Sequence, residues 1–190
     1  MENLRSQAPP ARLTAMLDRE RAALVIVDVQ EGFRRAVGDF ERVAHNAGVL
    51  AQGARALGLP LVVTEQYPKG LGATAPEVSA HTDGTAPVEK TVFSAARADG
   101  FDLDGRDQAL ICGIETHVCV WQTASDLLGK GVEVHVARDA VGSRTEENRE
   151  LGLGRMEGSG AVVTSVETAL FELLGEAGGP EFKTVQGLIK

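Results

Sequence analysis

Six short runs of apolar and β-branched residues alternate with segments long enough to hold helices, and this alternation constrains the fold more than any other feature. The first run, residues 22–28, is apolar up to a final aspartate, as in a strand covered on both faces. Crossovers of helical length join parallel strands. The sequence therefore predicts an α/β fold, a Rossmann-like three-layer α/β/α sandwich around a mostly parallel six-stranded sheet. The predicted strands are residues 22–28, 61–64, 88–92, 109–112, 132–137 and 161–164.

Apolar side chains at helical spacing predict the helices between these strands. Gly58 is expected to stop the first of them. Residues 132–137 alternate apolar and polar side chains, which predicts a strand with one exposed face near the sheet edge. A last short amphipathic helix, residues 182–189, is a candidate docking element between copies of the chain. Helices over about 40–57, 146–156 and 166–174 are each expected to begin at a capping residue: Asp39, Thr145 and Ser165.

The length of 190 residues is close to that of one domain, and 43% hydrophobic residues are enough for a full core. We expect residues 1–18 to form a flexible or partly helical N-terminal arm and residues 19–190 to form a single domain. Residues 65–86 carry repeated Pro and Gly with little periodicity, which predicts a long loop. Long loops in compact domains are often functional, so we expect this loop to lie over the site.

The charge balance bears on the partners of the chain. A net charge of -8 argues against a nucleic-acid surface or an anionic membrane face, because both need clustered Lys and Arg. A small-molecule substrate is expected instead. The two cysteines, Cys112 and Cys119, imply no disulfide framework, which fits a reducing cytosol. No run approaches the ~18 apolar residues of a membrane span, and the N-terminus has no signal-like apolar core. We expect a cytoplasmic protein.

Cys119 lies where a predicted strand gives way to a predicted helix. Residues 109–112 form an apolar run closed by Gly113, and helical spacing then extends to Gly129. A helix N-terminus favours an anion, so a thiol there is expected to ionise more easily and to act as a nucleophile. The alternative is a small buried hydrophobic residue, which is the commoner role of a lone cysteine.

Other polar residues fall at or just after predicted strand ends, and in parallel sheets these ends converge on one ligand-binding edge. They are Asp28, Glu65, Lys90 and Asp139, together with Cys119. Taken alone, Asp28 could cap a loop N–H and Lys90 could be a solvated surface lysine. Together, an acid, a cation and a thiol are what nucleophilic catalysis needs, because a thiolate requires a proton acceptor and a cation stabilises the anionic pair.

Residues 25–30, 89–95 and 113–120 resemble the three signatures of the isochorismatase-like cysteine hydrolases, which include nicotinamidases and N-carbamoyl amidohydrolases. The resemblance covers about residues 22–174 and is nearest to the isochorismatase domain-containing subgroup. It implies a catalytic triad of Asp28, Lys90 and Cys119, and it implies a homo-oligomer. It also implies a cis peptide between Ile114 and Glu115, with the backbone N–H groups of Glu115 and Cys119 forming an oxyanion hole.

Substrate-pocket candidates are spread over the segments around these motifs. They are Gln30, Phe33, Glu65, Gln66, Tyr67, Phe93 and His117. Nicotinamidases hold a metal with an Asp-x-His segment, whereas here His81 and Asp83 stand in the opposite order. No other spacing indicates a metal site, and His45 and His135 are interpreted as surface or packing residues. We therefore expect neither a metal nor another cofactor.

These features predict a metal-independent cysteine hydrolase that cleaves a small amide or related carbonyl compound through a thioester. The bond expected to break is a C–N bond other than a peptide bond. The alternative is a non-catalytic binding or interaction module on the same fold. A third hypothesis, vinyl-ether hydrolysis of isochorismate, is disfavoured because the enzymes for which the family is named use no nucleophilic cysteine at this position.

Overall fold

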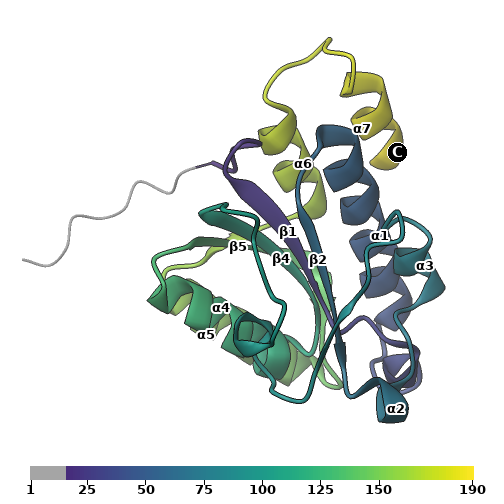
Figure 1. The fold of residues 1–190 in the computed structure, drawn as a ribbon. Helices are drawn as coiled ribbons and strands as arrows, with labels where there is room; N and C mark the ends of the chain where they lie inside the picture. Colours follow the sequence, from purple (N-terminus) through teal and green to yellow (C-terminus); the bar gives the residue numbers. More distant parts are fainter. Residues whose placement is uncertain (1–15) are drawn as a thin grey trace, which may run out of the picture.

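A parallel sheet flanked by helices forms the molecule in a computed structural model that describes residues 16–190 (Figure 1). All five strand pairings are parallel, in the order β3-β2-β1-β4-β5-β6, which confirms the predicted α/β architecture. The expected N-terminal arm lies outside the described residues except for 16–18, which are irregular. The strands are β1 (Ala22–Val27), β2 (Leu61–Gln66), β3 (Val88–Lys90), β4 (Gln108–Ile114), β5 (Glu133–Gly142) and β6 (Val162–Thr164).

Helices cover both faces of this sheet (Figure 1). The helices are α1 (Phe40–Leu57), α2 (Pro68–Leu71), α3 (Pro76–Ser79), α4 (Trp121–Gly129), α5 (Glu146–Gly158), α6 (Val166–Leu174) and α7 (Phe182–Leu188), with short turns η1 (Glu31–Phe33), η2 (Ala95–Arg97) and η3 (Thr116–Val120). One apolar core lies between the sheet and α1, α6 and α7, and the second lies between the sheet and α4 and α5. Successive β1 residues alternate between the two cores, so the whole strand is buried as predicted.

Helix ends follow the sequence signals in three of four cases. Gly58 ends α1 in the left-handed conformation, with φ of 70°. Thr145 and Ser165 accept bonds from backbone N–H groups of α5 and α6, as expected of N-caps. Asp39 precedes α1 but makes no capping bond, because its carboxylate pairs with Arg42 instead.

The strand predicted over 132–137 differs most from expectation. β5 runs on to Gly142, and its residues 134–137 are all buried because helices cover both sides of the sheet there. The exposed face inferred from polar alternation is therefore wrong. His135, the polar residue that suggested this face, is only 1% exposed.

The predicted loop over residues 65–86 is more ordered than expected. Its first two residues belong to β2, and the rest contains α2 and α3. The helix α3 packs so closely on α1 that a Cβ on Gly48 would lie 2.2 Å from the carbonyl oxygen of Glu77. This segment is therefore anchored along one side of the molecule.

The C-terminal helix α7 packs on its own chain. Val185 is fully buried, and Leu188 and Ile189 lie against the core on the α1 side. The apolar side that suggested a docking element is thus used internally, beside α1 and α6 (Figure 1). Among residues 16–190, no helix has the length and apolar character needed to cross a bilayer.

Candidate functional site

The carboxyl edge of the sheet brings together three side chains from distant parts of the chain. Asp28 directly follows β1, Lys90 is the last residue of β3, and Cys119 lies in the turn η3 after β4. The backbone of Asp28 is left-handed, with φ of 52°, a conformation uncommon for a non-glycine residue. All three residues are buried, so they form a largely desolvated cluster.

An ion pair between Asp28 and Lys90 is the centre of this cluster. Lys90 Nζ lies 2.6 Å from Asp28 Oδ2, and both side chains are fully buried. The ammonium also donates to Gln66 Oε1 at 2.8 Å and to the carbonyl oxygen of Phe93 at 3.1 Å. A buried pair persists only with such additional hydrogen bonds, because desolvation opposes its Coulomb attraction.

Thr64 is a site residue that the sequence reasoning missed. Its Oγ1 donates to Asp28 Oδ1 at 2.6 Å, so each carboxylate oxygen of Asp28 has its own donor. Thr64 pairs in register with Val27, one residue before Asp28. The sequence does show a polar residue at the end of the apolar run 61–64. Its position beside Asp28 follows only from the register of β1 and β2, which the sequence does not show.

The thiol of Cys119 is harder to ionise than its position at a helix start suggested. The pKa of Cys119 is raised to about 12, chiefly by burial and then by the charge of Asp28 and its hydrogen bond with the thiol. Lys90 and the backbone of Glu115 act in the opposite direction but are outweighed. The expectation of an easily ionised thiol is therefore wrong for this arrangement. The group beside Cys119 that can take its proton is Asp28.

The turn η3 that carries Cys119 is held by the last residue of β5 and the two residues that follow it. Thr116 Oγ1 donates to the carbonyl oxygen of Gly142 at 3.0 Å. His117 Nδ1 lies 3.1 Å from Ser143 Oγ, and Glu115 Oε1 accepts from Arg144 Nε at 2.9 Å. Three consecutive residues, 115–117, are thus paired with residues 142–144, which are the last residue of β5 and the two that follow it. The peptide bond between Ile114 and Glu115 is cis.

A second attachment holds the cysteine backbone from α4. Thr123 Oγ1 donates to the carbonyl oxygen of Cys119 at 2.7 Å, and it accepts from the backbone N–H of Ala95 at 2.8 Å. This threonine thereby links the nucleophile turn to the segment after Lys90. The segment that follows Lys90 and the turn that carries Cys119 are therefore joined through the Thr123 hydroxyl as well as through the side chains of the cluster.

Two of the pocket candidates make hydrogen bonds that hold neighbouring segments of the chain. Gln30 is fully buried, and its amide donates to the carbonyl oxygen of Gly72 at 2.7 Å. Glu65 Oε1 accepts from both the backbone N–H and the hydroxyl of Thr74, each at 2.7 Å. Both residues anchor the segment after β2, and their place in a substrate pocket stays a prediction.

The remaining pocket candidates lie in several environments. Tyr67 and Phe93 are 56% and 52% exposed. The backbone N–H of Tyr67 donates to the carbonyl oxygen of Lys90, and the carbonyl oxygen of Phe93 accepts from the Lys90 ammonium. Gln66 contacts the lysine directly. The structure places Phe33 half-buried against the α1-side core and His117 half-buried on the nucleophile turn.

Asp139 does not join the site. Because β5 continues beyond it, its Oδ1 accepts from the backbone N–H of Val166 at 2.9 Å, at the start of α6. Residues 16–190 contain no group of three or more His, Cys, Asp or Glu side chains arranged to hold a metal ion.

Comparison with protein families matches residues 22–168 to the isochorismatase domain. Isochorismatase domain-containing protein 2A of Mus musculus is 42% identical over 174 residues, which cover 90% of this chain and 84% of that protein. The secreted isochorismatase effector Isc1 of Phytophthora sojae is 43% identical over 177 residues, which cover 89% and 84% of the two chains.

Solved structures share the fold over most of their length. The MAR1 ribonuclease of Caenorhabditis elegans has a TM-score of 0.86 at 38% identity, with 92% of each chain covered. The YcaC gene product of Escherichia coli, described as an octameric hydrolase of unknown specificity, has a TM-score of 0.78 at 27% identity. That alignment covers 85% of this chain and 83% of the other.

Proposed function

The chain belongs to the isochorismatase family of hydrolases, and on this basis we propose that it is a metal-independent cysteine hydrolase of a small amide or related carbonyl compound. The observation that carries the proposal is the buried carboxylate of Asp28, which influences the Cys119 thiol while bound to Lys90. In this assignment Cys119 is the nucleophile and Asp28 the general base and acid. Lys90 stabilises the charge on Asp28.

The first half of the reaction forms a thioester. As Cys119 Sγ bonds to the substrate carbonyl carbon, its proton passes to Asp28 and the carbonyl electron pair moves onto oxygen. The backbone N–H groups of Glu115 and Cys119 would hold this oxyanion. When the carbonyl re-forms, the C–N bond breaks and the proton on Asp28 passes to the departing nitrogen. Ammonia or an amine leaves, and the acyl group stays on sulfur.

The second half regenerates the enzyme. Asp28 takes a proton from water as the water oxygen attacks the thioester carbon, and the acid product leaves when the C–S bond breaks. The thiolate then recovers its proton from Asp28. The high pKa of Cys119 suits this scheme, because the thiol loses its proton only as it attacks.

The direct test is ammonia release from a panel of small primary amides and N-carbamoyl compounds. For a compound that wild-type protein hydrolyses, Cys119→Ala should lower kcat by at least about 1,000-fold, because removing a nucleophile removes the covalent route. Cys112→Ala is the matched control, since this cysteine is buried in β4 away from the cluster and should keep its turnover. Unchanged turnover in Cys119→Ala would rule out the mechanism.

The alternative of a non-catalytic binding module predicts a different outcome for the same panel. A hydrolase should give an acyl adduct on Cys119 when the reaction is quenched with acid and the protein is weighed by mass spectrometry. A binding module gives neither ammonia nor an adduct with any compound. The pH midpoint of cysteine alkylation cannot separate the two, because burial raises the pKa of Cys119 in both cases.

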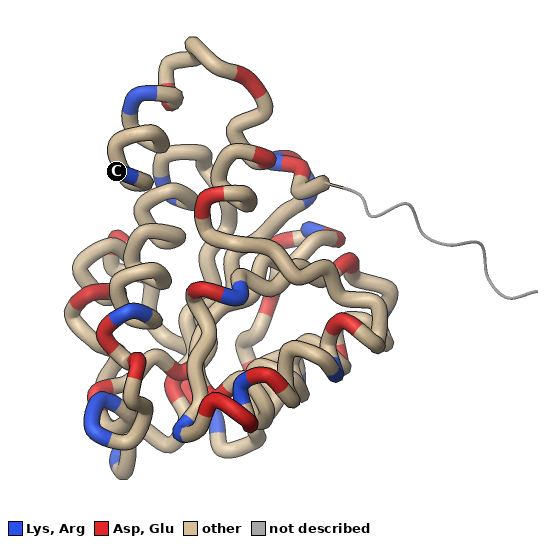
Figure 2. The backbone as a smooth tube through the Cα atoms, turned by 180° about the vertical axis from the view of Figure 1, so that it is seen from behind, with Lys and Arg blue, Asp and Glu red and all other residues tan. Residues whose placement is uncertain are grey.

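Isochorismate and RNA belong in the panel as contrasting substrates. Isochorismate cleavage remains the third hypothesis and gains no support from the arrangement of Cys119. The C. elegans neighbour is named a ribonuclease, but this chain has a net charge of -8. Its Lys and Arg residues are interspersed with Asp and Glu in the view of Figure 2, which disfavours an RNA surface.

The assembly and location of the protein are also proposals. A homo-oligomer is supported by the octameric E. coli neighbour, and a monomer measured by light scattering would contradict it. A cytoplasmic location rests on the sequence, whereas one relative is named a secreted effector. Fractionation of the source cells would test the location directly.

A further inference from the structure

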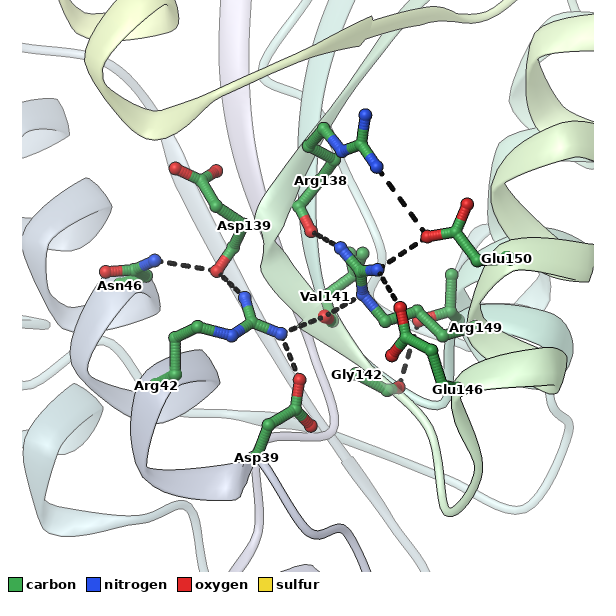
Figure 3. Close-up of polar contacts among 11 residues, drawn as sticks. Asp39, Arg42, Asn46, Arg138, Asp139, Val141, Gly142, Glu146, Arg149 and Glu150 are labelled. Carbon is green, nitrogen blue, oxygen red and sulfur yellow. Dashed lines mark hydrogen bonds and ion pairs between the residues drawn. The ribbon is translucent and has the colours of Figure 1, made fainter.

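The C-terminal part of β5 leaves regular pairing just before it reaches the nucleophile turn. Val136 pairs with Ile111 and Val141 pairs with Gly113, so five steps along β5 correspond to only two along β4. Such a bulge leaves backbone groups that need other partners. Residues 137–140 form this bulge segment, and the network around it is drawn in Figure 3.

An arginine from α5 binds the bulge segment on one face of the sheet. Arg149 is only 8% exposed, and its Nε donates to the carbonyl oxygen of Val141 at 3.2 Å. A second guanidinium nitrogen donates to the carbonyl oxygen of Arg138 (Figure 3). The third binds Glu146 at 2.7 Å and Glu150 at 2.6 Å, which balances the buried charge.

A second arginine binds the same segment from the opposite face. Arg42 of α1 donates to the carbonyl oxygens of Asp139 and Val141, and it pairs with Asp39. Asn46, one turn further along α1, donates to the carbonyl oxygen of Asp139 at 2.6 Å. Figure 3 shows the two guanidinium groups converging on the carbonyl of Val141. The bulge is thus held between two helices.

The residues that follow this clamp are those that hold the nucleophile turn. Gly142 directly follows Val141, and its carbonyl oxygen accepts from Thr116 Oγ1 at 3.0 Å. The helix α5 also touches the turn itself, because a Cβ on Gly152 would lie 2.7 Å from the carbonyl oxygen of Thr116. Arg149 and Gly152 are three residues apart and share one helix face. A single face of α5 therefore contacts both the bulge and the turn.

We propose that Arg149 is a positioning residue for the nucleophile. It places Cys119 by clamping the β5 bulge, and Arg42 assists from the other face. The inference rests on the proposed function for the role of Cys119. Without the fork of Arg149, the carbonyl of Arg138 loses its side-chain donor and the carbonyl of Val141 loses one of its two, so the bulge shifts to find others. A displacement of about 1 Å at a nucleophile can cost about 100-fold in rate.

The test compares Arg149→Lys and Arg149→Met with Arg138→Met. Arg138 is the matched control: it lies in the bulge, but its side chain is 55% exposed and, among residues 16–190, forms an ion pair only with Glu150, at 3.6 Å. The readouts are the rate of Cys119 alkylation by iodoacetamide across pH and the kcat for any amide that the panel identifies. Both are measured on variants that unfold cooperatively, well below their Tm.

Arg149→Met should lower kcat at least about 10-fold and shift the pH profile of Cys119 alkylation, because the distances from the thiol to Asp28 and Lys90 change. Arg149→Lys should fall between it and wild type, since lysine restores a charge but not the fork. Arg138→Met should match wild type. If a folded Arg149→Met protein kept both the alkylation profile and kcat, Arg149 would have only a stabilising role and the proposal would be wrong.

A double variant tests the route through Gly142. Thr116→Val removes the hydroxyl that binds the Gly142 carbonyl, so it should slow turnover in the same way. If Arg149 acts through this bond, the double variant Thr116→Val/Arg149→Lys should lose less turnover than the product of the two single-variant losses. Fully multiplicative effects would overturn the proposed route.

Arg42→Met keeps the proposal testable if Arg149 variants do not fold. Its side chain is 38% exposed, so it should fold, and it loses a contact to the same Val141 carbonyl. It should shift the alkylation profile in the same direction, and an unchanged profile would contradict the clamp. Equal hydrolysis by wild type and Cys119→Ala would instead contradict the proposed function. The alkylation profile does not depend on hydrolysis, so it tests the positioning of Cys119 separately.

Discussion

Asp28 has both carboxylate oxygens occupied and still influences the thiol beside it. Thr64 and Lys90 each donate a hydrogen bond to one of these oxygens, which fixes the orientation of the carboxylate. Its negative charge disfavours a second negative charge on Cys119, so the acid opposes thiolate formation in the resting protein. The same carboxylate can accept the proton during attack. Asp28 thus opposes thiolate formation at rest and accepts the proton during attack. A substitution that keeps the shape of the Asp28 side chain but removes its charge should separate these two effects.

Asp28→Asn should move alkylation and hydrolysis in opposite directions. Removing the charge lowers the pKa of Cys119, so iodoacetamide should react faster at neutral pH and the midpoint of its pH profile should fall. Hydrolysis should drop at least about 100-fold because the general base is lost. Alkylation rates with mass mapping of Cys119 would measure the first effect, and ammonia release the second.

Asp126→Asn is the control for this comparison, because Asp126 lies on α4 and pairs with Arg97 rather than with the site. It should leave both readouts near wild type. An Asp28→Asn protein whose alkylation midpoint stayed unchanged or rose would show that the charge of Asp28 does not control the thiol.

Helix α5 contributes to the site through a residue with no side chain. From sequence, Gly152 and Gly154 each weaken this helix by roughly 1 kcal/mol relative to alanine. The structure separates them: a Cβ on Gly152 would meet the backbone of Thr116 and His117 at 2.7 to 2.8 Å, whereas nothing lies within 4 Å of one on Gly154. Close approach of α5 to the nucleophile turn therefore requires a glycine at position 152.

Alanine substitutions at these two glycines should have opposite effects. Gly154→Ala should stabilise the protein by up to about 1 kcal/mol and leave turnover unchanged. Gly152→Ala should destabilise it by about 1–3 kcal/mol and reduce turnover, because the contacted atoms are backbone and must move. Urea unfolding and ammonia release measure the two effects. Equal stability and equal turnover in the two variants would contradict the requirement for glycine at position 152.

At the scale of the whole molecule, the end of the sheet opposite the site contains a buried histidine. His135 is 1% exposed, and its Nδ1 has no hydrogen-bond partner among the described residues. Burial lowers its pKa, although the charges of Glu172 and Glu133 act to raise it. The folded protein therefore binds a proton at this site less readily than the unfolded chain does.

Stability should consequently fall as the pH decreases below about 6.5, the usual pKa of an unfolded-chain histidine. Above that pH both states are neutral and the contribution is fully present. The loss is at most about 1.4 kcal/mol per pH unit for one proton. His135→Leu should flatten this dependence between about pH 7 and 5 in urea unfolding. The exposed His45→Leu should leave it unchanged, and equal slopes for wild type and His135→Leu would contradict the prediction.

Much of the fold could be predicted from sequence because the responsible signals are local. The apolar run of β1 requires burial on both faces, and Gly58, Thr145 and Ser165 mark helix ends through their own backbone or hydroxyl. The candidate site could also be located, because parallel strands bring their carboxyl ends to one edge. Asp28, Lys90 and Cys119 meet there, whereas Asp139 does not because β5 continues past it.

What the sequence by itself determined was therefore the alternation of strands and helices, the edge of the site and the family. Only the tertiary structure decided the burial of His135, the role of Thr64, the contact at Gly152 and the clamp at Arg149. It also reversed the expected ionisation of Cys119, because helix position is a local property whereas desolvation depends on everything packed around the thiol. These features arise between segments far apart in the chain, where register and packing determine which polar groups meet.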